Sequence, residues 1–147
     1  MTQIEKHGFE RLSLRLRLFL AAASVCWLAP LATAACLQPN PEGMGTHQQL
    51  GLPPCTFVWL FRTRCPSCGM TTSWAHAVRG QWLSAGRSNA GGAVLAAIAM
   101  LAGPWLLVSA VRGRWLFVEP NDRVLAGLAV VVAAITLADW AFRLWRG

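Results

Sequence analysis

The chain has 147 residues, of which 55% are hydrophobic and only 13% are charged, and its mean hydropathy is +0.44. A soluble domain of this length needs far more charged surface, so the composition excludes a soluble globular protein. The net charge is +7, but the basic residues, twelve arginines and one lysine, flank apolar segments instead of alternating with aromatic residues. This distribution argues against nucleic acid as a partner and predicts contact with a lipid bilayer.

An apolar segment at residues 18–36 follows a basic N-terminal arm at residues 1–17. It matches the length of about 20 residues that crosses the hydrocarbon core of a bilayer. Basic residues, an apolar run and then the small residues of Ala32-Thr33-Ala34 are also typical of a cleaved secretory signal. The run is long for a signal, which favours an uncleaved anchor, and both interpretations export the residues that follow.

Residues 37–54 contain four prolines and three glycines, and they are predicted to form an irregular exported loop. His47 lies in this loop without a partner pattern and is interpreted as a loop residue. The apolar run at residues 55–61 is too short to span a membrane. It is expected to rest in the interface or to fold back against the helices.

A short interfacial helix is predicted after the cysteine pair, over residues 73–79. Thr72 offers an N-cap for this helix, and Gly80 offers a C-terminal stop. Residues 84–89 then lead into the next apolar segment.

Two further apolar segments, residues 90–111 and 124–142, complete the prediction of an all-α membrane protein with three transmembrane helices in a single domain. Asp139 lies one turn from Arg143, so an i,i+4 ion pair is expected near the membrane face. Seven basic residues precede the first span or lie between the second and third, and six lie elsewhere. The positive-inside rule therefore favours a cytoplasmic N-terminus and an exported central region, residues 37–89.

The chain has five cysteines, and two of them lie in the sequence CPSCG at residues 65–69. In a metal site, the proline and the glycine would shape a turn that points backbone N–H groups at both sulfurs. Such a turn supplies two ligands, whereas a closed zinc site takes four. Cys55 and His76 are the candidates for the other two, and we expect Cys55, Cys65 and Cys68 to act as one constellation.

The same pair of cysteines admits two other interpretations. As a redox pair, Cys65 would attack a disulfide and Cys68 would resolve the mixed disulfide, and an exported location permits this exchange. A structural staple, either a disulfide or a tight turn, is the third interpretation. A hydrolase or a kinase is set aside because no stretch resembles a phosphate loop, paired carboxylates or a Ser/His/Asp set.

These features together predict an integral membrane protein that exposes a cysteine motif at the outer membrane–water interface. We interpret the protein as a non-enzymatic structural or metal-binding module, accessory to a membrane-protein partner, with zinc as the expected metal. The alternative is a membrane thiol–disulfide oxidoreductase that uses Cys65 and Cys68.

Residues 55–90 resemble the core of a widespread family of small bacterial membrane proteins of unknown function. Its members carry a cysteine, then a Cys-Pro-x-Cys-Gly-x-Thr motif, a short helix that ends in glycine, and an asparagine before the next span. The matching positions are Cys55, Cys65, Pro66, Cys68, Gly69, Thr71, Gly80 and Asn89. Two positions differ, because Thr72 stands where members usually have arginine and Ala90 where they usually have proline. The resemblance implies a multi-span helical domain in a bacterial inner membrane, with the motif at the membrane surface, and it implies no particular reaction.

Overall fold

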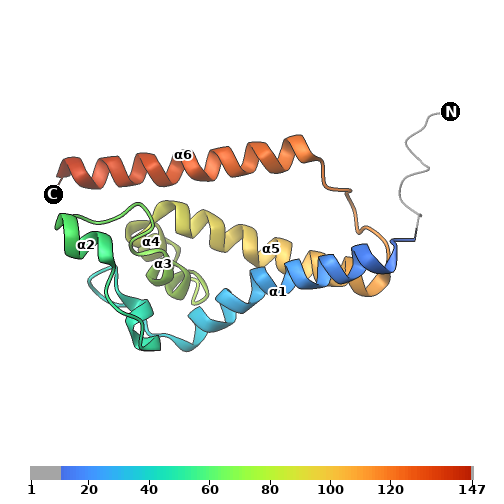
Figure 1. Ribbon diagram of the computed structural model, residues 1–147, viewed down its shortest axis with the longest axis horizontal. Helices are drawn as coiled ribbons and strands as arrows, with labels where there is room; N and C mark the ends of the chain where they lie inside the picture. The colour runs from blue at the N-terminus through green and yellow to red at the C-terminus, as the bar shows by residue number, and fades with distance from the viewer. Residues whose placement is uncertain (1–10, 147) are drawn as a thin grey trace.

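A computed structural model describes residues 11–146, and all the regular elements within these residues are helices. Three of the helices are long and apolar enough to cross a membrane: α1 (Leu14–Cys36), α5 (Ala90–Arg112) and α6 (Asp122–Arg146). They confirm the predicted all-α class with three candidate spans. Successive long helices run in opposite directions, so the end of α1, the start of α5 and the end of α6 lie at the same end of the molecule (Figure 1).

Four short helical elements gather at that end (Figure 1), and Cys55, Cys65 and Cys68 lie in the segments that connect them. They are the 3₁₀ turn η2 (Thr46–Leu50), α2 (Thr56–Phe61), α3 (Met70–Ala77) and α4 (Trp82–Ser88). The predicted short helix therefore exists as α3, although it begins at Met70 and not at residue 73. Gly69 precedes it in the left-handed conformation with φ of 88°, and Thr72 lies inside the helix instead of capping it.

The first span begins earlier than predicted, at Leu14, because the hydroxyl of Ser13 accepts a hydrogen bond from the Leu16 N–H at 3.3 Å. The last residues of the predicted basic arm are therefore helical, and residues 1–10 lie outside the described part of the chain. Arg17, now on α1, donates to the carbonyls of Ala110 at 2.8 Å and Val111 at 3.1 Å. It satisfies the free carbonyls at the end of α5.

The helices α1 and α5 pack closely because small residues line their contact. The Ser24 hydroxyl donates to the Gly103 carbonyl at 2.8 Å in a fully buried contact. An added side chain at Gly103 would meet the Leu28 side chain at 2.6 Å, so a larger residue here requires Leu28 to shift. Close packing through small residues is the usual way in which helices associate in lipid.

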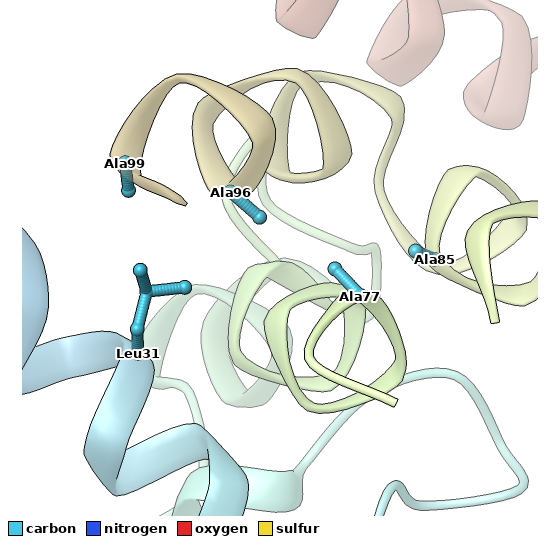
Figure 2. Close-up of a cluster of buried hydrophobic side chains, with 5 residues drawn as sticks. All are labelled: Leu31, Ala77, Ala85, Ala96 and Ala99. Atoms are coloured by element: carbon cyan, nitrogen blue, oxygen red, sulfur yellow. The ribbon is translucent and has the colours of Figure 1, made fainter. Parts of the chain in front are cut away.

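A cluster of small buried side chains joins α1 to the cysteine-bearing end. Leu31 of α1 is its one large member, and alanines from α3, α4 and α5 extend from it to one side (Figure 2). The cluster comprises Leu31, Ala77, Ala85, Ala96 and Ala99. Because these side chains are short, α3 and α4 lie directly against the long helices and hold the cysteine loop in a fixed place.

Arg79, just after α3, fastens the same end to α1. Its guanidinium donates to the final carbonyls of α1 and to α3 itself, at distances of 2.6–3.4 Å. The acceptors are the carbonyls of Ala34, Ala35, Leu37 and Ala75. A cation at a helix C-terminus also interacts favourably with the helix dipole.

Candidate metal centre

Cys55, Cys65 and Cys68 come together from two segments of the chain. Cys55 directly precedes α2, and the chain reverses after that helix at Arg62, whose backbone is left-handed with φ of 56°. The Cys55 and Cys65 sulfurs lie 3.7 Å apart, and the Cys65 and Cys68 sulfurs 2.8 Å apart. All three sulfurs lie within 4.8 Å of one another. The structure thus brings together the three cysteines that the sequence grouped.

The turn between Cys65 and Cys68 is held by its own backbone. The Cys68 N–H donates to the Cys65 carbonyl at 3.0 Å, and the Cys65 N–H donates to the Cys68 sulfur at 3.2 Å. Pro66 fixes the backbone after the first sulfur. Gly69 then allows the left-handed residue that turns the chain into α3. The turn therefore points a backbone donor at the Cys68 sulfur, which is one of the two sulfurs for which the metal interpretation expects such a donor.

Asn89 is the buried polar residue that organises this turn. Its side chain is fully buried, and its amide donates to the carbonyls of Pro66 at 3.0 Å and Cys68 at 3.2 Å. Its Oδ1 accepts from the Gly92 N–H at 2.7 Å and so caps α5. One side chain thus ties the cysteine turn to the start of the second span.

An ion pair on α6 reaches the same turn. Asp139 and Arg143 pair as expected from their spacing. Asp139 also accepts from the Ala90 N–H at 3.0 Å, while Arg143 donates to the carbonyls of Cys68 at 3.3 Å and Ser88 at 2.9 Å. The spacing predicted the pair but not its acceptors. Charged residues in membrane spans usually pair with one another or with backbone carbonyls, so the pair itself indicated that further polar acceptors lie nearby.

The other residues that the sequence singled out lie outside the group of three sulfurs. His76 is not part of the three-sulfur group, and its Nδ1 forms a hydrogen bond with the Gln81 side chain at 2.6 Å. Gly80 has φ of 73° and ends the turn after α3. Thr71 lines a cavity of about 270 Å³ that adjoins the three sulfurs. His47 of η2 lines this cavity as well.

The environments of the thiols differ in a way that separates their acidities. Burial and the hydrogen bond with Cys65 raise the pKa of the Cys68 thiol to about 12. Hydrogen bonding from the Val58 backbone lowers the pKa of the Cys55 thiol below its usual value of 9.0. In the metal-free protein, Cys55 is therefore the more reactive thiol of the two.

Three clustered thiols are a suitable donor set for a soft or borderline metal. Thiolate sulfur is the preferred ligand of Zn²⁺ and Cu⁺, and it disfavours Mg²⁺ and Ca²⁺. Burial makes deprotonation of the Cys68 thiol unfavourable in the free protein. A cation that binds the sulfur stabilises the thiolate and offsets this free-energy cost.

The helices and this site define a class: a multi-pass helical membrane protein with a three-cysteine centre at one end of its long helices. Residues 55–103 match the family described as Protein of unknown function (DUF2752), which confirms the resemblance seen in the motif. The match runs from Cys55 into α5 and includes Asn89, but it includes neither η2 nor α6. No curated protein matches the chain. No solved structure matches it either.

Proposed function

We propose that the protein is a module of a bacterial inner membrane that holds one zinc ion on Cys55, Cys65 and Cys68 and serves as an accessory to a membrane-protein partner. The observation that carries this proposal is the mutual approach of three sulfurs from two chain segments within 4.8 Å. A structural disulfide needs only two of these thiols. A metal ion is the partner that uses all three.

The surroundings of the sulfurs support a structural metal site. Arg143 and Asn89 both donate to the Cys68 carbonyl, so two long helices fix the position of the turn. A site that is positioned by its neighbours loses little entropy when the metal binds, whereas a site in a loose loop must be ordered first. The metal would in turn hold the segment before α2 against the turn before α3.

The expected test is metal analysis together with thiol titration of the purified protein. We expect about one zinc per chain and no disulfide, because the thiolates bind the metal. Cys65→Ser should lose most of this zinc. Cys26→Ser and Cys36→Ser are matched controls, because both thiols are exposed and lie outside the group, and they should retain it.

The contrary result of this test points to the second candidate function, thiol–disulfide exchange. The observation that favours it is the 2.8 Å separation of the Cys65 and Cys68 sulfurs. In that reaction Cys65 attacks a partner disulfide and releases one partner thiol, and Cys68 then displaces the second. The partner gains two electrons, and the Cys65–Cys68 pair becomes a disulfide. Absence of zinc together with one disulfide per chain would reject the metal proposal and favour this exchange.

We also propose that the cysteine end faces out of the cytoplasm. Arg11, Arg112 and Arg114 line a common recess at the opposite end of the molecule, and they form no ion pair within residues 11–146. At the cysteine end, Arg79 and Arg143 are bound to carbonyls and to Asp139, whereas Arg62 and Arg87 are exposed. The support for a cytoplasmic N-terminus is therefore the group of three arginines at the far end, together with the seven of thirteen basic residues that belong to that side, because cationic groups favour the cytoplasmic side. The contacts of Ser24 and Arg17 with α5 support an uncleaved first span.

Labelling of intact cells with a membrane-impermeant maleimide tests both the orientation and the thiol acidities. After chelation and mild reduction, we expect Cys55 to be labelled from outside, and at lower pH than Cys68. The Cys68 thiolate is scarce because its pKa is raised to about 12, so its labelling near pH 8 should be at least about tenfold slower. Because Cys36 is also exposed, the labelled residue is identified by peptide mapping, and Cys55→Ser is the control that removes the Cys55 signal. Labelling only after permeabilisation would contradict the orientation, and equal rates would contradict the burial of Cys68.

A further inference from the structure

His47 lies beside the three-sulfur centre although it is distant from the CPSCG motif in sequence. It belongs to η2, is half-buried, and lines the same cavity of about 270 Å³ as Cys55, Cys65 and Cys68. Its ring is not within the 4.8 Å group of ligand atoms. The cavity is the space that separates the ring from the sulfurs.

The position of η2 is set by a buried hydrogen bond to the motif helix. The hydroxyls of Thr46 and Thr72 lie 2.8 Å apart, and both side chains are fully buried. Thr46 also accepts from the Asn40 N–H at 3.0 Å. Because His47 is the next residue after Thr46, this contact keeps the imidazole at the cavity next to the start of α3.

The hydrogen bond of the imidazole selects the tautomer that a metal needs. Nε2 of His47 lies 3.2 Å from the carbonyl oxygen of Pro53. A carbonyl only accepts, so Nε2 carries the proton and Nδ1 keeps its lone pair. Within residues 11–146, Nδ1 forms no hydrogen bond. Metal-binding histidines commonly donate the other ring N–H to a backbone carbonyl in this way.

The carbonyl that holds the ring is close in the chain to the first cysteine of the centre. Pro53 precedes Cys55 by two residues, which span at most about 7 Å even when fully extended. The ring lies outside the 4.8 Å group, so it must move into the shared cavity to reach a zinc ion at about 2.0–2.1 Å. His76 also has one bonded ring nitrogen, Nδ1 to Gln81, but among the described residues it is His47 and not His76 that lines the cavity beside the sulfurs.

We propose that His47 is the fourth ligand of the metal centre, binding through Nδ1 to complete a Cys₃His site. This inference rests on the proposed metal function and adds a residue that the motif does not contain. Four protein ligands make a closed site of the structural kind, with no open position for a substrate. The metal would then hold the loop of residues 37–54 against α3, in addition to joining the two cysteine segments.

The test compares the full-length protein in detergent with His47→Ala and with His76→Ala as the matched control. Zinc X-ray absorption should show three sulfurs and one imidazole in the wild-type protein and in His76→Ala. In His47→Ala the imidazole signature should disappear. Loss of an outer-shell partner of a metal ligand lowers metal affinity about 10–100-fold, and loss of a ligand itself should lower the zinc affinity by at least as much. His47→Cys should restore the affinity with four sulfurs, which shows that the loop still folds.

The outcomes separate this inference from the function on which it rests. If the wild-type protein binds zinc and His47→Ala binds it with unchanged affinity and an intact imidazole signature, His47 is not the ligand and the three-cysteine site stands. Loss of the imidazole signal in His76→Ala would likewise overturn the assignment to His47. If neither the wild-type protein nor the variants bind zinc or Co²⁺, the proposed function itself fails, and the fourth ligand fails with it.

Discussion

Replacing Asn89 by alanine is expected to destabilise the cysteine-bearing end and release bound metal. The Asn89 side chain is fully buried and makes three hydrogen bonds, two to the cysteine turn and one to the start of α5. Loss of a helix N-cap costs about 1 kcal/mol. Each buried group left without a partner costs about 1–3 kcal/mol. Cys68 keeps its bond from Arg143, so we expect a total of about 2–4 kcal/mol, measured as reduced thermal stability in detergent.

A second variant separates the two functions of this side chain. Asn89→Asp preserves the oxygen that caps α5 but cannot donate to the Pro66 and Cys68 carbonyls. We therefore expect Asn89→Asp to keep helical content and still lose metal. Asn121→Ala is the matched control, because Asn121 is exposed and lies before α6, and within the described residues its side chain accepts only from the Arg123 N–H. Metal retention in Asn89→Ala equal to that of Asn121→Ala would show that Asn89 does not hold the turn.

Replacing Gly69 by alanine is expected to be comparably severe, for a steric reason. The residue has φ of 88°, where a side chain costs roughly 1–2 kcal/mol. An added methyl group would also collide with the Ser88 carbonyl oxygen and would lie 2.6 Å from that of Gly43. Both obstacles are backbone atoms, so relief requires movement of the turn or of the loop of residues 37–54. We expect a loss of stability of at least about 3 kcal/mol and loss of metal.

Gly86→Ala provides the matched control for this substitution. Gly86 lies inside α4, and an added methyl group there would meet no atom within 4 Å. Alanine in a helix interior should leave stability unchanged or raise it by roughly 0.5–1 kcal/mol. Thermal unfolding and zinc content measured on both variants decide the matter. If Gly69→Ala behaves like Gly86→Ala, the close approach of the turn to Ser88 is not required for the fold.

The parts of the fold that depend on local chemistry were predictable from the sequence. The three spans follow from long uncharged runs, because transfer of such runs into lipid is favourable wherever they lie in the chain. The Asp139–Arg143 pair follows from helical spacing alone. The grouping of Cys55 with Cys65 and Cys68 followed from the metal interpretation, because a closed zinc site takes more ligands than the CPSCG turn supplies. The helix α4 was missed because its short sequence, WLSAGRS, includes a glycine and two serines and has weak helical propensity.

The identity of the groups that surround the cysteines is decided by the tertiary structure. Arg143 reaches the Cys68 carbonyl because α6 ends beside the turn, and Thr46 meets Thr72 because the loop folds back onto α3. Sequence spacing favoured His76 as the nearby histidine, whereas in the described structure it is His47 that lines the cavity beside the sulfurs. The sequence by itself therefore determined the class of protein and the three sulfur atoms of the candidate centre. Contacts between residues distant in the chain depend on how the helices pack, so only the tertiary structure decided what holds those atoms and what lies next to them.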